Sequence, residues 1–118
     1  MSQFPVINTA IPQRRYQFGD FGVTVLSEID SGDGHDYQFV AAFVKEGESQ
    51  PRLYLVSERL PPGRRDAGSH ALRLINSAMD ETMDVDARWS RLDVFCDQAL
   101  QMGGQILGLE QDVPYLLG

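Results

Sequence analysis

The chain has 118 residues, a length that fits a single domain in which folding hides roughly two-thirds of the unfolded surface. Its apolar fraction of 42% argues against disorder, and its net charge of −7 argues against general affinity for double-stranded nucleic acid or anionic membranes. A single cysteine, Cys96, excludes an internal disulfide and a zinc site built from paired cysteines.

The N-terminal residues do not have the order of a secretory signal. They contain no uninterrupted apolar run, and Arg14 and Arg15 follow the apolar residues instead of preceding them. No stretch of the sequence approaches the roughly 18 apolar residues that a membrane-spanning helix needs. We therefore expect a soluble cytoplasmic protein that does not cross a membrane.

The first segment of the chain has no regular hydrophobic period. Residues 1–13 contain Pro5 and Pro12 and show neither helical nor strand spacing. We predict an extended N-terminal arm over residues 1–13 and one α+β domain over residues 14–118. Within that domain, Gly19-Asp20 between Phe18 and Phe21 predicts either a two-residue hairpin turn or a bulge in one long strand.

Three later segments have the composition of β-strands. Residues 21–30 alternate apolar and polar side chains, which is typical of a half-buried strand. Residues 37–45 are apolar on both faces, which is typical of a central or covered strand. Residues 52–58 form another predicted strand, with Leu53 and Leu55 on one face and Tyr54 and Val56 on the other. The apolar positions expected on one face are Phe21, Val23, Val25 and Ile29 in the first strand and Tyr37, Phe39, Ala41 and Phe43 in the second.

The polar stretch "SGDGHD", residues 31–36, lies between two of these strands. Gly32 and Gly34 suit the positive φ angles that a short reversal needs. Counted from Asp30, a calcium loop of the EF-hand type would need oxygen ligands at the two positions that these glycines occupy. We therefore predict a turn and no metal ion.

The C-terminal half predicts two helices. Asp66 or Ser69 can cap the first, which is expected to end by Met83, and Asp84 or Asp86 can cap the second. Apolar residues recur at helical spacing in both, at Ala71, Leu74, Ile75 and Ala78 and then at Trp89, Leu92, Phe95, Cys96, Ala99 and Met102. The sequence therefore predicts an α+β fold in which an antiparallel meander of three to four strands is followed by two helices packed on one face.

This arrangement leaves the second face of the sheet apolar and without cover. A large exposed apolar patch usually marks an interface, and a second copy of the chain is the simplest cover. The N-terminal arm or the apolar residues near the end of the sequence, Tyr115, Leu116 and Leu117, could cover it instead. We predict a homodimer, with an interface formed by Val40, Ala42, Val44, Tyr54 and Val56.

Residues 51–75 form a basic segment between two acidic ones. They hold five arginines against two acids, Glu58 and Asp66. The amide groups at the start of a helix attract anions, and the first predicted helix begins here. The segment therefore predicts a site for phosphate or carboxylate groups, unless the arginines pair with acids elsewhere in the chain. The candidate ligand-binding residues are Arg59, Arg64, Arg65, His70 and Arg73.

The sequence contains no recognisable catalytic constellation. It has no G-x-S-x-G turn, P-loop or dinucleotide-binding glycine motif, and Cys96 is expected on the buried side of a helix. We predict no cofactor and favour a non-catalytic, homodimeric protein-interaction or regulatory domain that could also bind a further protein partner. The alternatives are a binder of a small anionic ligand, such as phosphate or a nucleotide, or of single-stranded nucleic acid, and an enzyme with an anionic substrate.

Overall fold

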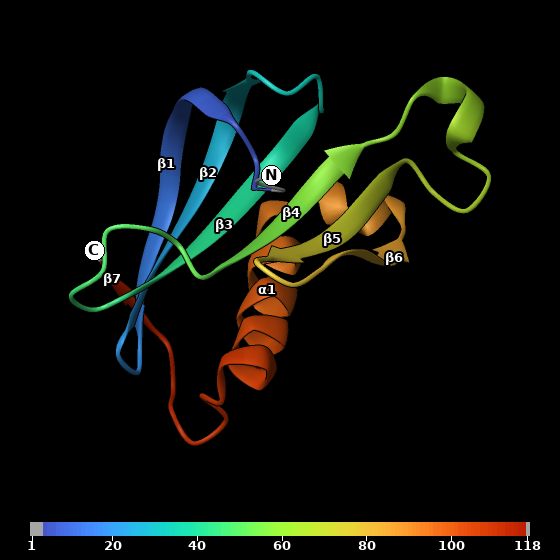
Figure 1. Ribbon diagram of the computed structural model, residues 1–118. Helices are drawn as coiled ribbons and strands as arrows, with labels where there is room; N and C mark the ends of the chain where they lie inside the picture. The colour runs from blue at the N-terminus through green and yellow to red at the C-terminus, as the bar shows by residue number, and fades with distance from the viewer. Residues whose placement is uncertain (1–3, 118) are drawn as a thin grey trace.

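A seven-stranded antiparallel sheet with one α-helix is the architecture of the computed structural model, which describes residues 4–117 (Figure 1). The order across the sheet is β6-β5-β4-β3-β2-β1-β7, so consecutive strands are neighbours until β7 returns to the outer edge of β1. The strands are β1 (Ile7–Phe18), β2 (Phe21–Ser31), β3 (Tyr37–Lys45), β4 (Leu53–Arg59), β5 (His70–Asn76), β6 (Asp80–Val85) and β7 (Tyr115–Leu117). The helices are α1 (Leu92–Leu107) and two short 3₁₀ helices, η1 (Pro62–Arg64) and η2 (Ala87–Ser90).

The first two strands form a hairpin. Gly19 and Asp20 make the two-residue turn between β1 and β2, and Gly19 has a φ of +58°, which glycine adopts without strain. The hairpin interpretation of this segment is therefore confirmed over the single bulged strand.

One face of the sheet packs against α1, and we call it the helix face. Buried aromatic and aliphatic side chains from β1 to β5 form the main core here with Phe95, Cys96 and Ala99 of α1. The helix lies close to the sheet because Gly103 and Gly104 have no side chains, and a Cβ at Gly103 would collide with the ring of Phe43. The buried stripe predicted for this helix is confirmed at these three core positions.

Two backbone irregularities move predicted residues to the other face. Tyr37, expected beside Phe39, lies in a second buried cluster with Val40 because the pairing register of β3 with β4 shifts between residues 37 and 39. Ile29 also contacts that second cluster, and Glu28, the residue before it, has a φ of +49°. Strict alternation therefore fails at the ends of β2 and β3 that flank the 31–36 turn.

The predicted fold of three to four strands followed by two helices is wrong. The first predicted helix is the antiparallel pair β5–β6, and the sheet has seven strands. The apolar residues of this segment fill both faces of β5, the second strand from the β6 edge, where Leu72 and Leu74 face α1 and Ile75 faces away. The second helix begins at Leu92, later than predicted, because Asp86 caps η2 by accepting a hydrogen bond from the N–H of Arg88.

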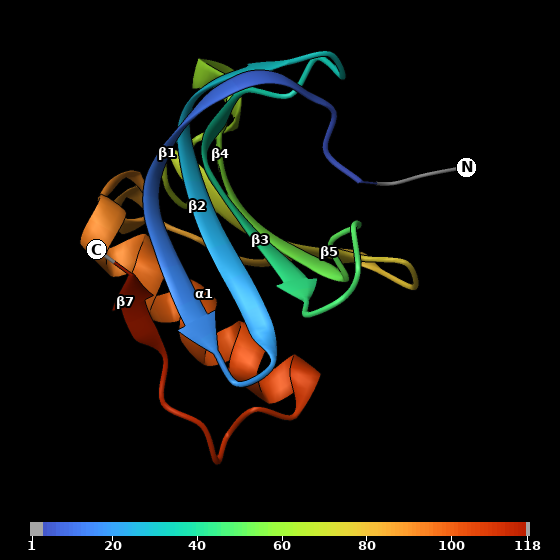
Figure 2. The same ribbon diagram turned by 90° about the vertical axis from the view of Figure 1, so that its left-hand side faces the viewer.

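The predicted division into an arm and a domain remains a prediction. Residues 7–13 of the predicted arm belong to β1, and residues 1–3 lie outside the described residues. In Figure 2 the chain before β1 bends towards the side of the sheet opposite α1. Among the residues described, no helix has both the length and the hydropathy that crossing a membrane requires.

Candidate interaction surface

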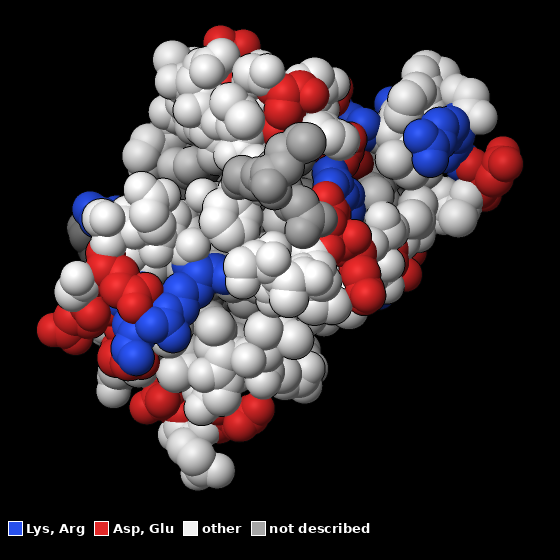
Figure 3. All heavy atoms as spheres, in the orientation of Figure 1, with Lys and Arg blue, Asp and Glu red and all other residues white. Residues whose placement is uncertain are grey.

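The structure brings three of the five predicted ligand-binding residues together: His70 lies opposite Arg59 across β4 and β5, and Arg59 and Arg65 are both near enough to His70 to lower its pKa. Arg59, the last residue of β4, pairs with Asp36 at 2.6 Å, and Arg65 donates to the carbonyl of Leu60. Arg64 is exposed in η1. On the side of the molecule seen in Figure 3, basic groups lie next to acidic ones rather than gathering in a single patch. The helix N-terminus that motivated the anion site is absent here, because residues 65–69 form a loop that leads into β5. The anion site remains a prediction without that support.

Arg73 is held between two carboxylates on the face of the sheet opposite α1. Its side chain is 13% exposed and forms ion pairs with Glu58 on β4 and, at 2.6 Å, with Asp80 on β6. Burial acts to lower the pKa of Arg73, but the hydrogen bonds from the two carboxylates outweigh burial and raise the pKa. The guanidinium group is therefore part of the structural framework, and its charge is already neutralised.

His70 is a buried neutral group that lies near Arg59 and Arg65. Its ring is within 2.8 Å of the Ser69 hydroxyl, and the residue is 8% exposed. Burial lowers the pKa of His70, and the nearby charges of Arg59 and Arg65 lower it further. At neutral pH it contributes no positive charge for an anion. The thiol of Cys96 is also buried, and burial raises its pKa, so it is a poor nucleophile.

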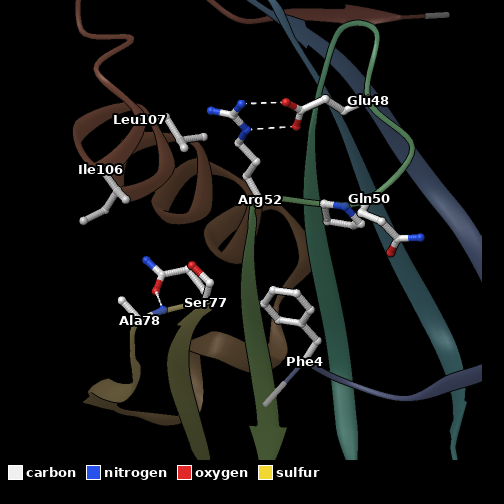
Figure 4. Close-up of a pocket in the computed structure, with 10 residues that line it drawn as sticks. Phe4, Glu48, Gln50, Arg52, Ser77, Ala78, Ile106 and Leu107 are labelled. Carbon is white, nitrogen blue, oxygen red and sulfur yellow. Dashed lines mark hydrogen bonds and ion pairs between the residues drawn. The ribbon is translucent and has the colours of Figure 1, made fainter. Parts of the chain in front are cut away.

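A hollow of about 560 Å³ lies where Phe4, the start of β4, the end of β5 and the last turn of α1 meet (Figure 4). Arg52 on its wall is paired with Glu48 through two hydrogen bonds, the longer at 2.9 Å. The side-chain oxygen of Asn76 accepts from the N–H groups of Ala78 and Met79. The arginine and the asparagine of this hollow are therefore engaged in contacts within the chain.

The face opposite α1, which we call the open face, is covered over one half only. Val40 and Val56 are completely buried within a single chain, and Tyr54 is 9% exposed. Ala42 and Val44 are half-buried. Of the five residues predicted to form an interface, these last two retain appreciable exposed surface. That these five residues contact a second copy of the chain remains a prediction.

The cover over β4 comes from the N-terminal segment. The ring of Phe4 lies against Tyr54, and Ile7 and Ile29 also pack on the second cluster. Asp33 fixes this segment: its carboxylate accepts from the N–H of Val6 at 2.9 Å and from the hydroxyl of Tyr37 at 3.0 Å. The stretch "SGDGHD" is thus a turn, and its aspartate anchors the preceding chain.

The uncovered half of the open face extends from β3 to the edge of the sheet. Directly opposed residues of antiparallel strands have their side chains on the same face, so rows can be followed across the strands. One row is Ala42, Thr24, Arg15 and Leu117, and the next is Val44, Gly22, Gln17 and Tyr115. We call these eight residues the open strip. Its middle is a shallow hollow of about 390 Å³, where Gly22 provides no side chain.

β7 is the most exposed apolar element among residues 4–117. Tyr115 is 69% exposed, Leu116 62% and Leu117 50%, although all three pair with β1. Leu116 lies opposite Tyr16 on the helix face, whereas Tyr115 and Leu117 belong to the open strip. The apolar residues near the end of the sequence therefore dock on the sheet edge without becoming buried.

The sequence indicated only parts of this surface. Tyr115–Leu117 stood out because of their apolar character, and Ala42 and Val44 because both faces of their strand are apolar. Gly22 and Arg15 gave no signal, since a glycine and an arginine in a strand are also compatible with a solvated surface. Their importance follows from strand register, which the sequence does not specify.

Comparisons of the chain with models of protein families, with curated proteins and with solved structures each found no match.

Proposed function

We propose that this chain is a non-catalytic protein-interaction domain that works in the cytoplasm as a homodimer. The observation that carries the proposal is the exposed apolar edge strand β7, continuous with the open strip. Three adjacent apolar residues that are each at least half exposed are unusual on a monomer and typical of an interaction site.

The positions of the reactive groups support a non-catalytic role. Cys96 is enclosed in the core, His70 is buried next to Ser69, and His35 contacts Glu58 at 2.8 Å. Arg73 is neutralised by two carboxylates. These side chains are engaged in contacts within the fold, whereas the outer edge of β7 pairs with no other strand of the described chain.

Mass measurement in solution tests the proposal. Light scattering after size exclusion, over a series of protein concentrations, is expected to give a mass of twice 13.2 kDa that falls towards 13.2 kDa on dilution. A mass that stays at 13.2 kDa up to the highest soluble concentration would contradict the homodimer.

A further inference from the structure

We infer that two copies of this chain associate edge to edge through β7, so that two seven-stranded sheets become one continuous antiparallel sheet. The inference rests on the proposed function and deepens it, because it names a second copy as the occupant and β7 as the contact.

The backbone of β7 can accept a further strand. β7 pairs with residues 15–17 of β1 on one side and is the last strand of the sheet on the other. The outward N–H and C=O groups of an edge strand form a template for another strand, and proteins usually block that edge with charges, proline or a bulge. β7 contains none of the three, whereas the rest of the outer edge of β1 contains Pro12.

The two edges of the sheet differ in charge, and this difference favours β7 over β6 as the contact with a second copy. At the opposite edge β6 carries Asp80, Glu81 and Asp84. Asp80 and Asp84 pair with Arg73 and Arg88 of their own chain, but Glu81 forms no ion pair in the described part of the chain, so a second copy of β6 would add its own unpaired carboxylate to a charged edge, which is unfavourable. Two copies of β7 bring together three uncharged, exposed apolar side chains from each chain. A second copy can therefore add at one edge and is repelled at the other.

A two-fold axis gives this pairing a defined register. With three residues in each strand, complete antiparallel pairing places Leu116 opposite Leu116 of the second copy. Tyr115 then lies opposite Leu117 of the second copy, and both lie on the open face. The row that begins at Ala42 continues across the axis into the row that ends at Val44 of the second copy. The open strips of the two copies would thus join into one continuous surface, with apolar side chains of β7 on both sides of the axis.

Charges beside β7 complement this arrangement. In the part of the chain that the structure describes, neither Arg14 nor Arg15 forms an ion pair, and neither do Glu110 and Asp112, which precede β7. Because the second copy of β7 runs in the opposite direction, its acidic residues approach the end of β7 where the two arginines lie. Opposite charges then lie at the same end of the pairing on each side of the axis.

A pair of charge variants tests the inference. Leu116→Glu and Leu116→Lys each place like charges opposite each other at the axis, and we expect each to weaken self-association by about tenfold or more. An equimolar mixture of the two variants places Glu opposite Lys, and we expect the dimer mass to return. Ile106→Glu on α1, at a position 49% exposed, is the matched control and should leave the dimer unchanged.

The outcomes separate the inference from the proposed function. If the wild type is dimeric and both Leu116 variants remain as dimeric as the Ile106→Glu control, β7 is not the contact, but the homodimer stands. If both variants are monomeric and their mixture is monomeric too, the two-fold pairing at Leu116 is overturned. A wild type that is monomeric at every concentration overturns both. Thermal melting of each variant, expected within a few degrees of the wild type, shows that loss of the dimer is not loss of the fold.

Discussion

The ring of Phe4 lies against the ring of Tyr54, with 5.4 Å between the ring centroids and 52° between their planes. This contact brings the N-terminal segment onto the open face above β4. It explains how β4, which has apolar residues on both faces, is covered within one chain: α1 packs on one face of the sheet, and the N-terminal segment covers part of the other. The part of the open face that remains uncovered is the open strip, whose most exposed apolar residues belong to β7.

The packing of Phe4 predicts a measurable contribution to stability. Phe4→Ala removes a half-buried ring from Tyr54, and we expect the free energy of unfolding to fall by about 1–2 kcal/mol, less than for a fully buried phenylalanine. Urea denaturation measures the change. Val6→Ala, at a neighbouring residue that is 48% exposed, should change stability by less than about 0.5 kcal/mol. Equal effects of the two substitutions would contradict the covering role of Phe4.

The anchor at Asp33 predicts a defined pH dependence. Burial acts to raise the pKa of Asp33, but hydrogen bonds from the N–H groups of Val6 and His35 and from the Tyr37 hydroxyl outweigh it and lower the pKa below 3.8. A carboxylate with a lowered pKa stabilises the fold fully above its unfolded pKa and loses that contribution as the pH falls through its folded pKa.

Asp33→Asn is therefore expected to lower stability by about 1–2 kcal/mol at pH 7. The difference from the wild type should stay constant down to about pH 5 and shrink as the pH falls below about 4. Denaturation at a series of pH values measures this difference. Asp36→Asn in the same turn, whose side chain is 64% exposed, is the control and should cost less than about 1 kcal/mol. A difference for Asp33→Asn that is unchanged at pH 3 would rule out the charged anchor.

The ion pairs of Arg73 predict a large effect of losing one cation. Arg73→Met leaves Glu58 and Asp80 close together without their shared partner, and we expect a loss of about 2–3 kcal/mol in the free energy of unfolding. Arg73→Lys should recover only part of it, since an ammonium group lacks the planar fork that reaches two carboxylates. Arg88→Met removes a pair whose arginine is 55% exposed and should cost less than about 1 kcal/mol. Similar losses at positions 73 and 88 would contradict a structural role for Arg73.

The sequence predicted the antiparallel sheet and the helix packed on it but not the number of elements. β2, β3 and β4 were predictable because their side chains alternate or are apolar throughout. The region of β5 was misassigned because Ala71, Leu74 and Ile75 fit helical spacing as well as a strand buried on both faces. Tertiary contacts decide between the two, since Leu74 meets α1 while Ile75 joins the cluster around Val40.

The close approach of α1 to the sheet predicts that a small substitution is harmful. In a helix, alanine is more favourable than glycine by about 1 kcal/mol. Gly103→Ala nevertheless places a methyl group against the ring of Phe43. We expect a net loss of about 1–3 kcal/mol in the free energy of unfolding, measured by urea denaturation. Gln105→Ala, at an exposed position of the same helix, should lie within about 0.5 kcal/mol of the wild type. A more stable Gly103→Ala protein would show that the helix can move away.

The candidate surface could be predicted less well than the fold. The basic segment was visible in the sequence, but three of its arginines have partners within the chain: Arg59 pairs with Asp36, Arg65 donates to a carbonyl, and Arg73 is paired across β4 and β6. The apolar face of β3 was also visible, but Val40 and Val56 are covered by a segment distant in sequence. Which apolar residues remain exposed depends on such long-range contacts, and no local pattern encodes them.

A cysteine at the centre of β7 tests the edge-to-edge dimer most directly. Opposed residues of antiparallel strands have Cα atoms roughly 4.5–5.5 Å apart, within the range that a disulfide needs. Leu116→Cys, mixed with a mild oxidant, is expected to form a disulfide-linked dimer on a non-reducing gel much faster than Ile106→Cys, and the buried Cys96 is present in both proteins. If Leu116→Cys links no faster than Ile106→Cys while the protein is dimeric in solution, the two copies do not meet at β7.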